Sequence, residues 1–447
     1  MITDRTLLLT KNQERRTKND KRPSFFEFSL TSSTDSLAST VRRAVSEALG
    51  NPSGFTLLHG PHIPPTAWDY VKDCLDTGWV SSAGAYVTRF EEALAGYTGC
   101  RRAVVTVNGT AALQVALVLA GVRPGDEVIA PSLTFVATAN AISHCGAVPH
   151  FVDVNESRLS IDPDALQERL EKIAEPAADG VRNRQSGRRI AAVCPMHCFG
   201  HPAELDRIVE ICDRWGLALV EDAAESLGST YRGRHTGTFG LVSAVSFNGN
   251  KILTTGGGGA ILTDDETLAD RAKHLTTTGK VPHAWEFHHD VVAWNYRMPN
   301  LNAALGLAQL EMLPRLLTAK RALAERYRSL FHEIAGVRWL AEPEESRSNQ
   351  WLQCLLLDEP DMAVRDAVLG ELNGAGLQSR PVWEPMHRLP MYRDAPRGPM
   401  AVTESIYRRA INVPSSAELA PGWPDAFAED RREGDRLEGA GHEGAGA

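Results

Sequence analysis

The feature that most constrains the fold of this chain is a regular alternation of short apolar runs with amphipathic stretches between Arg102 and Asp265. The apolar runs have the length of strands, which we expect at Ala103–Val107, Glu127–Ala130, Val148–Val152, Ile190–Cys194 and Leu217–Val220. The amphipathic stretches have the length of helices, which we expect at Ala111–Ala120, Ala137–Cys145, Asp164–Ile173 and Ala203–Trp215. Such alternation is typical of a mostly parallel sheet that helices cover on both faces. The sequence therefore predicts an α/β fold.

Two segments depart from this alternation. After Asp222, the runs Ala244–Phe247 and Gly259–Thr263 predict two closely connected strands. The stretch Ala174–Arg189 is polar and irregular, which is typical of a surface loop.

Beyond residue 300 the pattern predicts a smaller α+β unit. A long helical region runs from Asn302 to about Ala335, and we expect Pro314 to interrupt it. A strand at Trp351–Leu357 and a helix at Met362–Leu372 follow.

Composition suggests four parts of the chain. Residues 1–34 are polar and charged, and we expect an N-terminal extension without fixed structure. Residues 35–300 are expected to form a large domain that opens with a helix at Asp35–Leu49, and residues 301–416 a small C-terminal domain. Residues 417–447 are rich in Gly, Ala, Glu and Arg, which predicts a disordered tail.

The overall charge and the cysteines argue against several classes of protein. With 47 basic and 56 acidic residues the net charge is −9, which argues against a general nucleic-acid-binding protein. No apolar run is long enough to predict a membrane span. The 7 cysteines are odd in number and lie in apolar or mixed segments, as expected of reduced thiols in a cytoplasmic protein.

Lys251 and Asp222 are the residues that point to a chemistry. Lys251 ends the run Ser246–Lys251, which predicts a tight turn, and four glycines follow at Gly256–Gly259. Asp222 lies at the end of an earlier predicted strand, where ligands of open α/β sheets bind. A lysine amine that forms a Schiff base, with an aspartate that keeps the pyridine nitrogen protonated, is what pyridoxal 5'-phosphate (PLP) requires. The alternatives are a solvated lysine and a helix-capping aspartate.

A phosphate-binding turn is predicted where the first of these strands ends. Gly109 lets the backbone approach an anion, and Thr110 supplies a hydroxyl group and the N-cap of the following helix. Ser246 supplies a second hydroxyl group close to Lys251. The alternatives are an ordinary strand–turn–helix cap and a hydroxyl group bonded to the backbone. Together with Lys251, the cofactor phosphate is the favoured interpretation.

Two further residues are candidates for cofactor contacts. Phe135 follows another predicted strand and could stack on a pyridine ring, although core packing is nearly as good an interpretation. Asn295 precedes a strongly helical run, in a polar loop that could reach a phosphate in its own subunit or in a neighbouring one.

A zinc site is the main competing interpretation of the middle of the chain. Cys194, His197, Cys198 and His201 have the residue types of a zinc site, but structural zinc sites separate their two ligand pairs by a longer stretch. We therefore predict no metal, and expect this segment to be a loop beside the substrate cleft.

These residues together resemble the DegT/StrS family of PLP-dependent sugar-nucleotide aminotransferases. The stretches that carry the resemblance are Asn108–Leu113, Pro131–Thr138, Glu221–Ser226, Ser246–Lys251, Thr254–Gly257 and Trp294–Leu301. The similarity covers roughly Asp35 to Ser416. The sequence around Glu225 and Pro381–Trp383 is similar to enzymes that supply amino sugars for legionaminic-acid-like surface glycans.

The resemblance implies fold type I, a homodimer with active sites at the subunit interface, and L-glutamate as amino donor. It implies that Lys251 is the Schiff-base lysine and that Asp222 contacts the ring nitrogen. The other residues implied to bind PLP are Phe135 by stacking, Gly109, Thr110 and Ser246 at the phosphate, and Asn295 from the second subunit.

The chain departs from the family pattern at two places. Glu225 stands where many relatives carry Gln or His near the phenolic oxygen of the ring, so a carboxylate there needs a proton or a different role. The segment after Ser416 lacks the closing apolar stretch that the family predicts.

The function implied is transfer of an amino group from glutamate to a keto group of a nucleotide-linked deoxysugar, with a 4-keto sugar linked to UDP or GDP expected, for surface-glycan biosynthesis. Dehydration of a deoxysugar on the same scaffold is a competing function, but relatives with that activity replace the lysine by histidine. A non-catalytic PLP-binding regulator or sensor, or a structural dimer without cofactor, would use the same scaffold without turnover.

Overall fold

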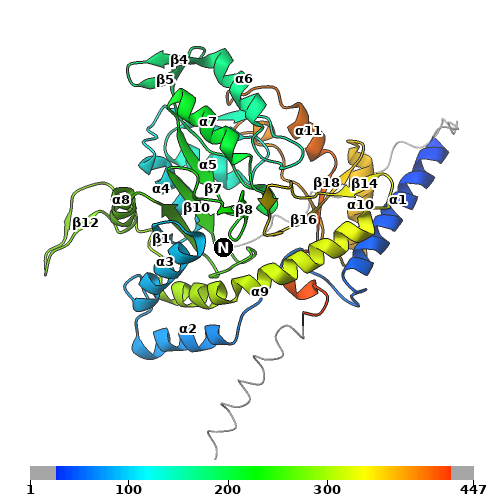
Figure 1. Ribbon diagram of the computed structural model, residues 1–447, viewed down its shortest axis with the longest axis horizontal. Helices are drawn as coiled ribbons and strands as arrows, with labels where there is room; N and C mark the ends of the chain where they lie inside the picture. The colour runs from blue at the N-terminus through cyan, green and yellow to red at the C-terminus, as the bar shows by residue number, and fades with distance from the viewer. Residues whose placement is uncertain (1–26, 424–447) are drawn as a thin grey trace, which may run out of the picture.

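The computed structural model describes residues 27–423, and its largest feature is a nine-stranded sheet (Figure 1). Seven strands follow the order β1-β11-β10-β7-β6-β2-β3. Their bounds are β1 Arg102–Thr106, β2 Glu127–Pro131, β3 Val148–Val152, β6 Arg189–Val193, β7 Ala218–Asp222, β10 Val242–Ser246 and β11 Gly259–Thr263. Strand β11 is antiparallel to β1 and β10, and the remaining neighbours along this row are parallel. The predicted α/β fold with a mostly parallel sheet is confirmed.

Helices cover both faces of this sheet. One face packs against α4 (Gly109–Leu119), α5 (Val136–His144) and α8 (Glu266–Thr276). The helices on the other face are α3 (Ala85–Thr98), α6 (Pro163–Ile173), α7 (Leu205–Trp215) and the first half of α9 (Asn300–Phe331). Because successive strand residues point to opposite faces, Val104 packs with α4 and Val105 with α3.

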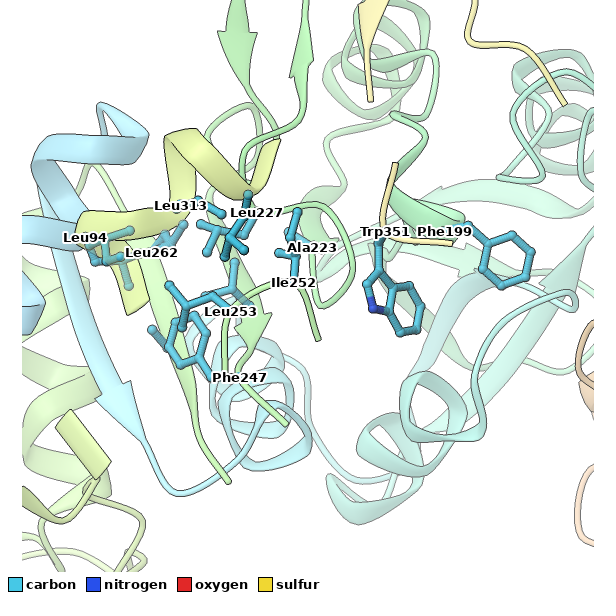
Figure 2. Packing of buried hydrophobic residues seen from close by; sticks show 14 of the residues in the cluster. Leu94, Phe199, Ala223, Leu227, Phe247, Ile252, Leu253, Leu262, Leu313 and Trp351 are labelled. Carbon is cyan, nitrogen blue, oxygen red and sulfur yellow. The ribbon is translucent and has the colours of Figure 1, made fainter. Parts of the chain in front are cut away.

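The buried cluster on the α3 side joins distant parts of the chain (Figure 2). It brings together Leu94 of α3, Leu262 of β11 and Leu313 of α9, all at 0% exposure. Full burial of each such side chain contributes roughly 1.5–3 kcal/mol. Phe199 and Trp351 belong to the same cluster at its far side, so the core continues to the pocket described below.

A second sheet of four antiparallel strands lies beside the second half of α9. Its order is β14-β16-β18-β17, with bounds Val337–Trp339, Gln353–Leu357, Ala410–Val413 and Arg380–Pro381. Helices α10 (Met362–Gly374) and α1 (Glu27–Ala48) pack against each other beside it. The remaining elements are α2 Thr66–Thr77, α11 Ala401–Tyr407, β8 Thr230–Tyr231, β9 Arg234–His235, β12 Lys280–Val281, β13 His288–His289, β15 Ser346–Arg347, η1 Cys198–Gly200, η2 Met386–Arg388 and η3 Ala417–Leu419.

The predicted surface loop at residues 174–189 is wrong, because this segment forms a hairpin of β4 (Ala174–Ala177) and β5 (Gly180–Asn183) that pairs with β6. The hairpin is polar, yet it is fixed by a buried carboxylate: Glu127 accepts hydrogen bonds from Asn183 Nδ2 at 2.8 Å and Ser186 Oγ at 2.6 Å. Polar residues that serve a buried acceptor look like loop residues in a sequence.

The predicted interruption at Pro314 is also wrong, since α9 is one continuous helix through that residue. Proline removes one backbone hydrogen bond inside a helix and usually kinks or breaks it. Here Leu310, Leu313 and Leu316 are all buried on the core side, and their packing holds the helix together.

The ordered chain extends beyond both predicted ends. Helix α1 begins at Glu27, before the predicted start at Asp35. After residue 416, η3 packs against α9, and Ala417 and Ala420 are buried. The disorder predicted for residues 1–26 and 424–447 lies outside the described residues. The division into two domains at residue 300, where α9 begins, stays a prediction.

None of the helices in residues 27–423 combines the length and hydropathy that a bilayer span requires.

Candidate active site

A pocket of about 310 Å³ lies at the carboxyl ends of the parallel strands. This edge is where open α/β sheets bind their ligands, and the volume lies at the lower end of the range for small-molecule sites. The residues that line it are Asn108, Gly109, Thr110, Leu113, Phe135, Ala137, Met196, Asp222, Ala224, Glu225, Ser246, Asn248, Asn250, Lys251, Trp351 and Trp383. Seven of the eight predicted site residues therefore meet in one cavity, and Asn295 is the exception.

Lys251 is held inside the pocket and is not a solvated surface lysine. Its side chain is 11% exposed, and its Nζ lies 3.0 Å from Glu225 Oε1. The same Nζ lies 3.9 Å from the centre of the Trp351 ring, which is the geometry of a cation–π contact. The lysine amine therefore has a carboxylate on one side and an aromatic face on another.

Asp222 ends strand β7 and is 4% exposed. Its Oδ2 accepts a hydrogen bond from Thr138 Oγ1 at 2.7 Å, and its Oδ1 accepts one from the Ala224 N–H at 3.2 Å. The element that follows β7 in the described chain is the strand β8, so the helix-cap alternative is excluded. Burial raises the pKa of Asp222, and the bond from Thr138 only partly opposes this. A cationic N–H group in the pocket would restore the ionised form.

The N-terminus of α4 lines one end of the pocket. The predicted N-cap at Thr110 is wrong: the cap is Asn108, whose side chain accepts from the Ala111 N–H at 2.8 Å, because the helix begins at Gly109. A Cβ atom at Gly109 would lie 2.7 Å from Ser246 Cβ, closer than real contacts allow. Glycine is thus required for the approach of the helix start to Ser246.

Aromatic side chains form one wall of the pocket. Phe135 is 48% exposed, which excludes the core-packing alternative, and its ring centre lies 6.2 Å from that of Trp383. The ring of Trp383 lies 4.9 Å from that of Phe199, which in turn lies 6.5 Å from that of Trp351. The exposed ring of Phe135 is available to a planar ligand.

Asn295 is not among the residues that line this pocket. Its backbone forms an isolated bridge with Thr277, and the next residue, Tyr296, accepts a hydrogen bond from the Val107 N–H at 2.9 Å. Its predicted contribution from a second subunit stays a prediction.

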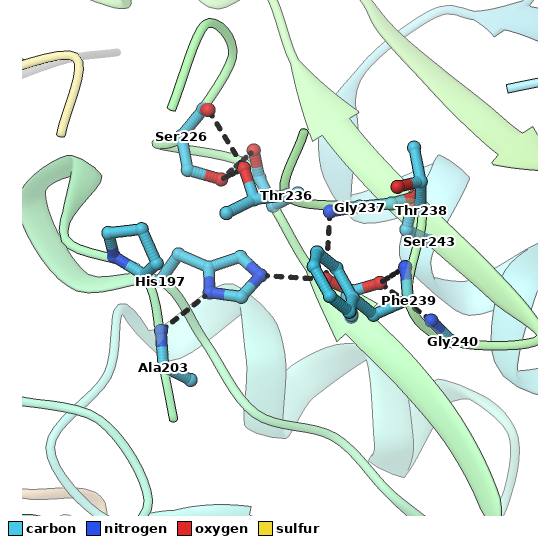
Figure 3. A network of polar contacts seen from close by, with 12 residues as sticks. His197, Ala203, Ser226, Thr236, Gly237, Thr238, Phe239, Gly240 and Ser243 are labelled. Carbon is cyan, nitrogen blue, oxygen red and sulfur yellow. Dashed lines mark hydrogen bonds and ion pairs between the residues drawn. The ribbon is translucent and has the colours of Figure 1, made fainter. Parts of the chain in front are cut away.

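Of the four residues in the rejected zinc interpretation, His197 has other partners, whereas both ring nitrogens of His201 are buried without a hydrogen-bond partner among residues 27–423. His197 Nε2 lies 3.1 Å from Glu221 Oε2, and its Nδ1 accepts from the Ala203 N–H at 3.1 Å (Figure 3). Cys194 and Cys198 are buried thiols whose pKa values burial raises well above the usual range. Within residues 27–423, no group of three or more His, Cys, Asp or Glu side chains is arranged to hold a metal ion.

Three residues at the site were not singled out from the sequence: Thr138, Phe199 and Trp351. Thr138 follows Phe135 by one turn of α5, so its position on the pocket side could have been inferred from helix periodicity. Phe199 and Trp351 come from segments far from Lys251 in the chain, and no local signal points to them.

The residues present fit PLP. The pocket offers a lysine amine, a buried carboxylate whose pKa is raised by burial, the backbone at a helix start and an exposed aromatic ring. The required glycine at the helix start leaves room where a Cβ atom would stand.

Comparison with known proteins agrees with this chemistry. The model of the DegT/DnrJ/EryC1/StrS aminotransferase family matches residues 62–425. The chain belongs to this family. GDP-perosamine synthase from Caulobacter vibrioides is 37% identical over 362 residues, which cover 80% of this chain and 92% of that protein. GDP-perosamine synthase from Vibrio cholerae is 36% identical over 370 residues, 82% of this chain and 94% of that protein.

The fold is shared with solved aminotransferases. The crystal structure of the aminotransferase TlmJ from Streptoalloteichus hindustanus matches with a TM-score of 0.75 and 29% identity, covering 86% of this chain and 100% of that one. The predicted family, fold type I and PLP are confirmed, and the protein is a PLP-dependent sugar aminotransferase.

Proposed function

We propose that this aminotransferase moves the amino group of L-glutamate to the keto group of a nucleotide-linked 4-keto deoxysugar, carried by GDP or UDP, for a surface glycan. The observation that carries the proposal is the meeting of Lys251 and Asp222 in one pocket whose ends are a helix N-terminus and an aromatic wall. The names of the two GDP-perosamine synthases favour GDP as the nucleotide.

Each residue has a separate task in this proposal. Asp222 holds a proton on the pyridine nitrogen, and Thr138 keeps its carboxylate oriented. The backbone at Gly109 and the hydroxyl groups of Thr110 and Ser246 bind the phosphate, which the helix dipole favours. When bound, PLP supplies an aldehyde that carries the nitrogen and a ring that takes up the electron pair of the broken C–H bond.

Lys251 is the covalent anchor and the acid–base group of the reaction. Its Nζ accepts the proton that leaves the α-carbon of glutamate and returns a proton to the new C–N carbon of the sugar. Only an unprotonated amine can accept that proton, so the pocket has to control where the proton of Lys251 goes. Phe135 supports one face of the ring by stacking.

The proposal includes a homodimer. Large apolar side chains are exposed on and after α2, at Trp68 and Trp79, and on the β12–β13 hairpin, at Trp285 and Phe287. Exposed apolar surface of this kind is typical of protein–protein contacts.

Light scattering tests the dimer. Mixing Lys251→Ala and Asn295→Ala chains should restore activity if Asn295 serves the second subunit's site; no recovery would assign it to its own.

The decisive experiment is a substrate panel. Purified protein reconstituted with PLP is incubated with glutamate and then with 4-keto deoxysugars linked to GDP or UDP, while 2-oxoglutarate and the amino sugar are measured. One nucleotide sugar should give equal amounts of both products. Absence of 2-oxoglutarate with every substrate would contradict the proposed reaction.

A further inference from the structure

Glu225 and Lys251 form a buried ion pair with few other partners. Their side chains are 2% and 11% exposed, and Glu225 Oε1 lies 3.0 Å from Lys251 Nζ. The second carboxylate oxygen, Oε2, accepts the Phe199 N–H at 2.9 Å. Among residues 27–423 these are the only hydrogen-bond donors to this carboxylate. Loss of the Lys251 charge would leave Glu225 with a single donor.

The backbone at Phe199 is arranged for this contact. Phe199 has a φ of 55°, in the left-handed region that a phenylalanine rarely adopts. Such a conformation costs on the order of 1–3 kcal/mol and persists only where surrounding packing enforces it. Phe199 is fully buried between Trp351 and Trp383, so the aromatic wall keeps its N–H directed at Glu225.

The other groups that face Glu225 do not favour its ionised form. Asp222 approaches from β7 with a charge of the same sign, and the thiol of Cys198 approaches from η1. Burial raises the pKa of Glu225, the charge of Lys251 and the Phe199 N–H oppose that shift, and Asp222 adds to it. Without the Lys251 ammonium group, every remaining influence except one backbone N–H favours the neutral acid.

We propose that Glu225 is the proton acceptor for Lys251: it takes the proton that the Lys251 ammonium group gives up when its nitrogen becomes bonded to the aldehyde carbon, whose oxygen leaves as water, and it keeps that proton while the freed lysine amine acts as the base. In this step an Nζ–H bond breaks and an Oε1–H bond forms. An ammonium–carboxylate pair becomes an amine and a carboxylic acid, so the net charge of the pocket is unchanged. This inference rests on the proposed role of Lys251 as the covalent anchor.

A glutamate in this role explains why a carboxylate can stand beside the cofactor. Once Lys251 holds PLP and has lost its ammonium charge, an ionised Glu225 would be a second negative charge near Asp222, which is unfavourable. A neutral acid at Glu225 removes that charge. It can also donate a hydrogen bond, which an ionised carboxylate cannot.

The test is an infrared difference spectrum of the full-length protein with PLP minus the protein without it. The wild type should gain the band of a protonated carboxylic acid, sensitive to D₂O, and lose carboxylate intensity. The band should be absent in Glu225→Gln and retained in Glu311→Gln, a control on α9 outside the pocket. A wild-type spectrum without the band would overturn the inference.

Further variants separate the possible failures. Asp222→Asn should keep the acid band; its loss there would assign the proton to Asp222 and refute the role of Glu225. Should Glu225→Gln fail to fold, Glu225→Asp keeps an acid, and its band should move in frequency; an unchanged band would refute the assignment. If Lys251→Ala binds PLP with the visible spectrum of the wild type, the proposed function fails. If that spectrum is lost but the wild type lacks the acid band, only the proton transfer fails.

Discussion

Glu221 and Glu225 lie on either side of Asp222 and are both buried, but their surroundings are opposite. Glu221 is saturated: it accepts backbone N–H groups of Gly237, Phe239 and Gly240 at 2.7–2.8 Å and contacts His197 at 3.1 Å (Figure 3). Burial acts to raise the pKa of Glu221, but the bond to His197 and the backbone N–H groups outweigh it, and the pKa is lowered.

Glu225 has one backbone N–H and one ammonium group, and its pKa is raised. The comparison shows that burial alone does not distinguish a carboxylate with a structural role from one that takes part in a reaction. The number of fixed donors does, because a saturated carboxylate has no capacity left for a proton or a ligand.

The variant Lys251→Arg tests the chemical side of this contrast. The guanidinium group keeps the positive charge beside Glu225 but cannot release its proton or anchor PLP, so turnover should fall more than about 1000-fold. The denaturation midpoint should change little. Assays of 2-oxoglutarate formation and urea unfolding measure both; substantial residual transamination would refute the role of Lys251.

The variant Glu221→Gln tests the structural side. One side-chain oxygen is replaced by an NH₂ group that faces backbone N–H donors, so the free energy of unfolding should fall by about 3 kcal/mol. Urea denaturation gives this value. A loss below about 1 kcal/mol would show that the network of Figure 3 contributes little, and the contrast with Glu225 would fail.

The variant Gly109→Ala disturbs the pocket without touching either carboxylate. Its Cβ atom would collide with Ser246, so the affinity for PLP should fall about tenfold, or 1.4 kcal/mol. Gly96→Ala on α3 is the matched control, since a Cβ atom there meets nothing within 4 Å. Fluorescence titration with PLP compares them, and equal affinities would contradict the phosphate-binding role of this turn.

The pH dependence of stability should have opposite signs at the two glutamates. The lowered pKa of Glu221 gives stability that is present above the unfolded pKa, near ~4.3, and is lost as pH falls through the folded pKa. The raised pKa of Glu225 gives stability that is present below that value and is lost as pH rises. Glu225→Gln should therefore change stability by less than about 1 kcal/mol at pH 4 and become relatively more stable toward pH 7.

Unfolding of both glutamine variants and the wild type from pH 4 to 7 measures these slopes. Parallel slopes for the two variants would mean that their carboxylates titrate alike.

The sequence predicted the sheet strands well because each is a short, almost wholly apolar run between polar turns; Val148–Val152 and Gly259–Thr263 agree with the structure residue for residue. The prediction failed where polar side chains are hydrogen-bonded to a buried partner. The β4–β5 hairpin looked like a loop because its fixing partner, Glu127, lies far away in the chain.

The candidate site was likewise predicted only as far as local sequence patterns reach. Asp222 ends a strand, and Gly109 and Lys251 come a few residues after strand ends, positions that local patterns reveal. The partners that decide their chemistry, such as Phe199 and Trp351, reach the pocket only through tertiary folding. The unusual Glu225 was noticed from the sequence, but its single fixed donor could be known only from the structure.

Helix α9 carries one last consequence. Its first half is buried with Leu94 and Leu262 beneath the large sheet, and its second half, through Leu323 and Tyr327, is buried with α1 and the four-stranded sheet. Neither sheet can separate from this shared helix without exposing buried leucine side chains to water. Heating should therefore melt both sheets in a single calorimetric peak, and chain fragments cut at residue 300 should be insoluble apart yet recover when refolded together.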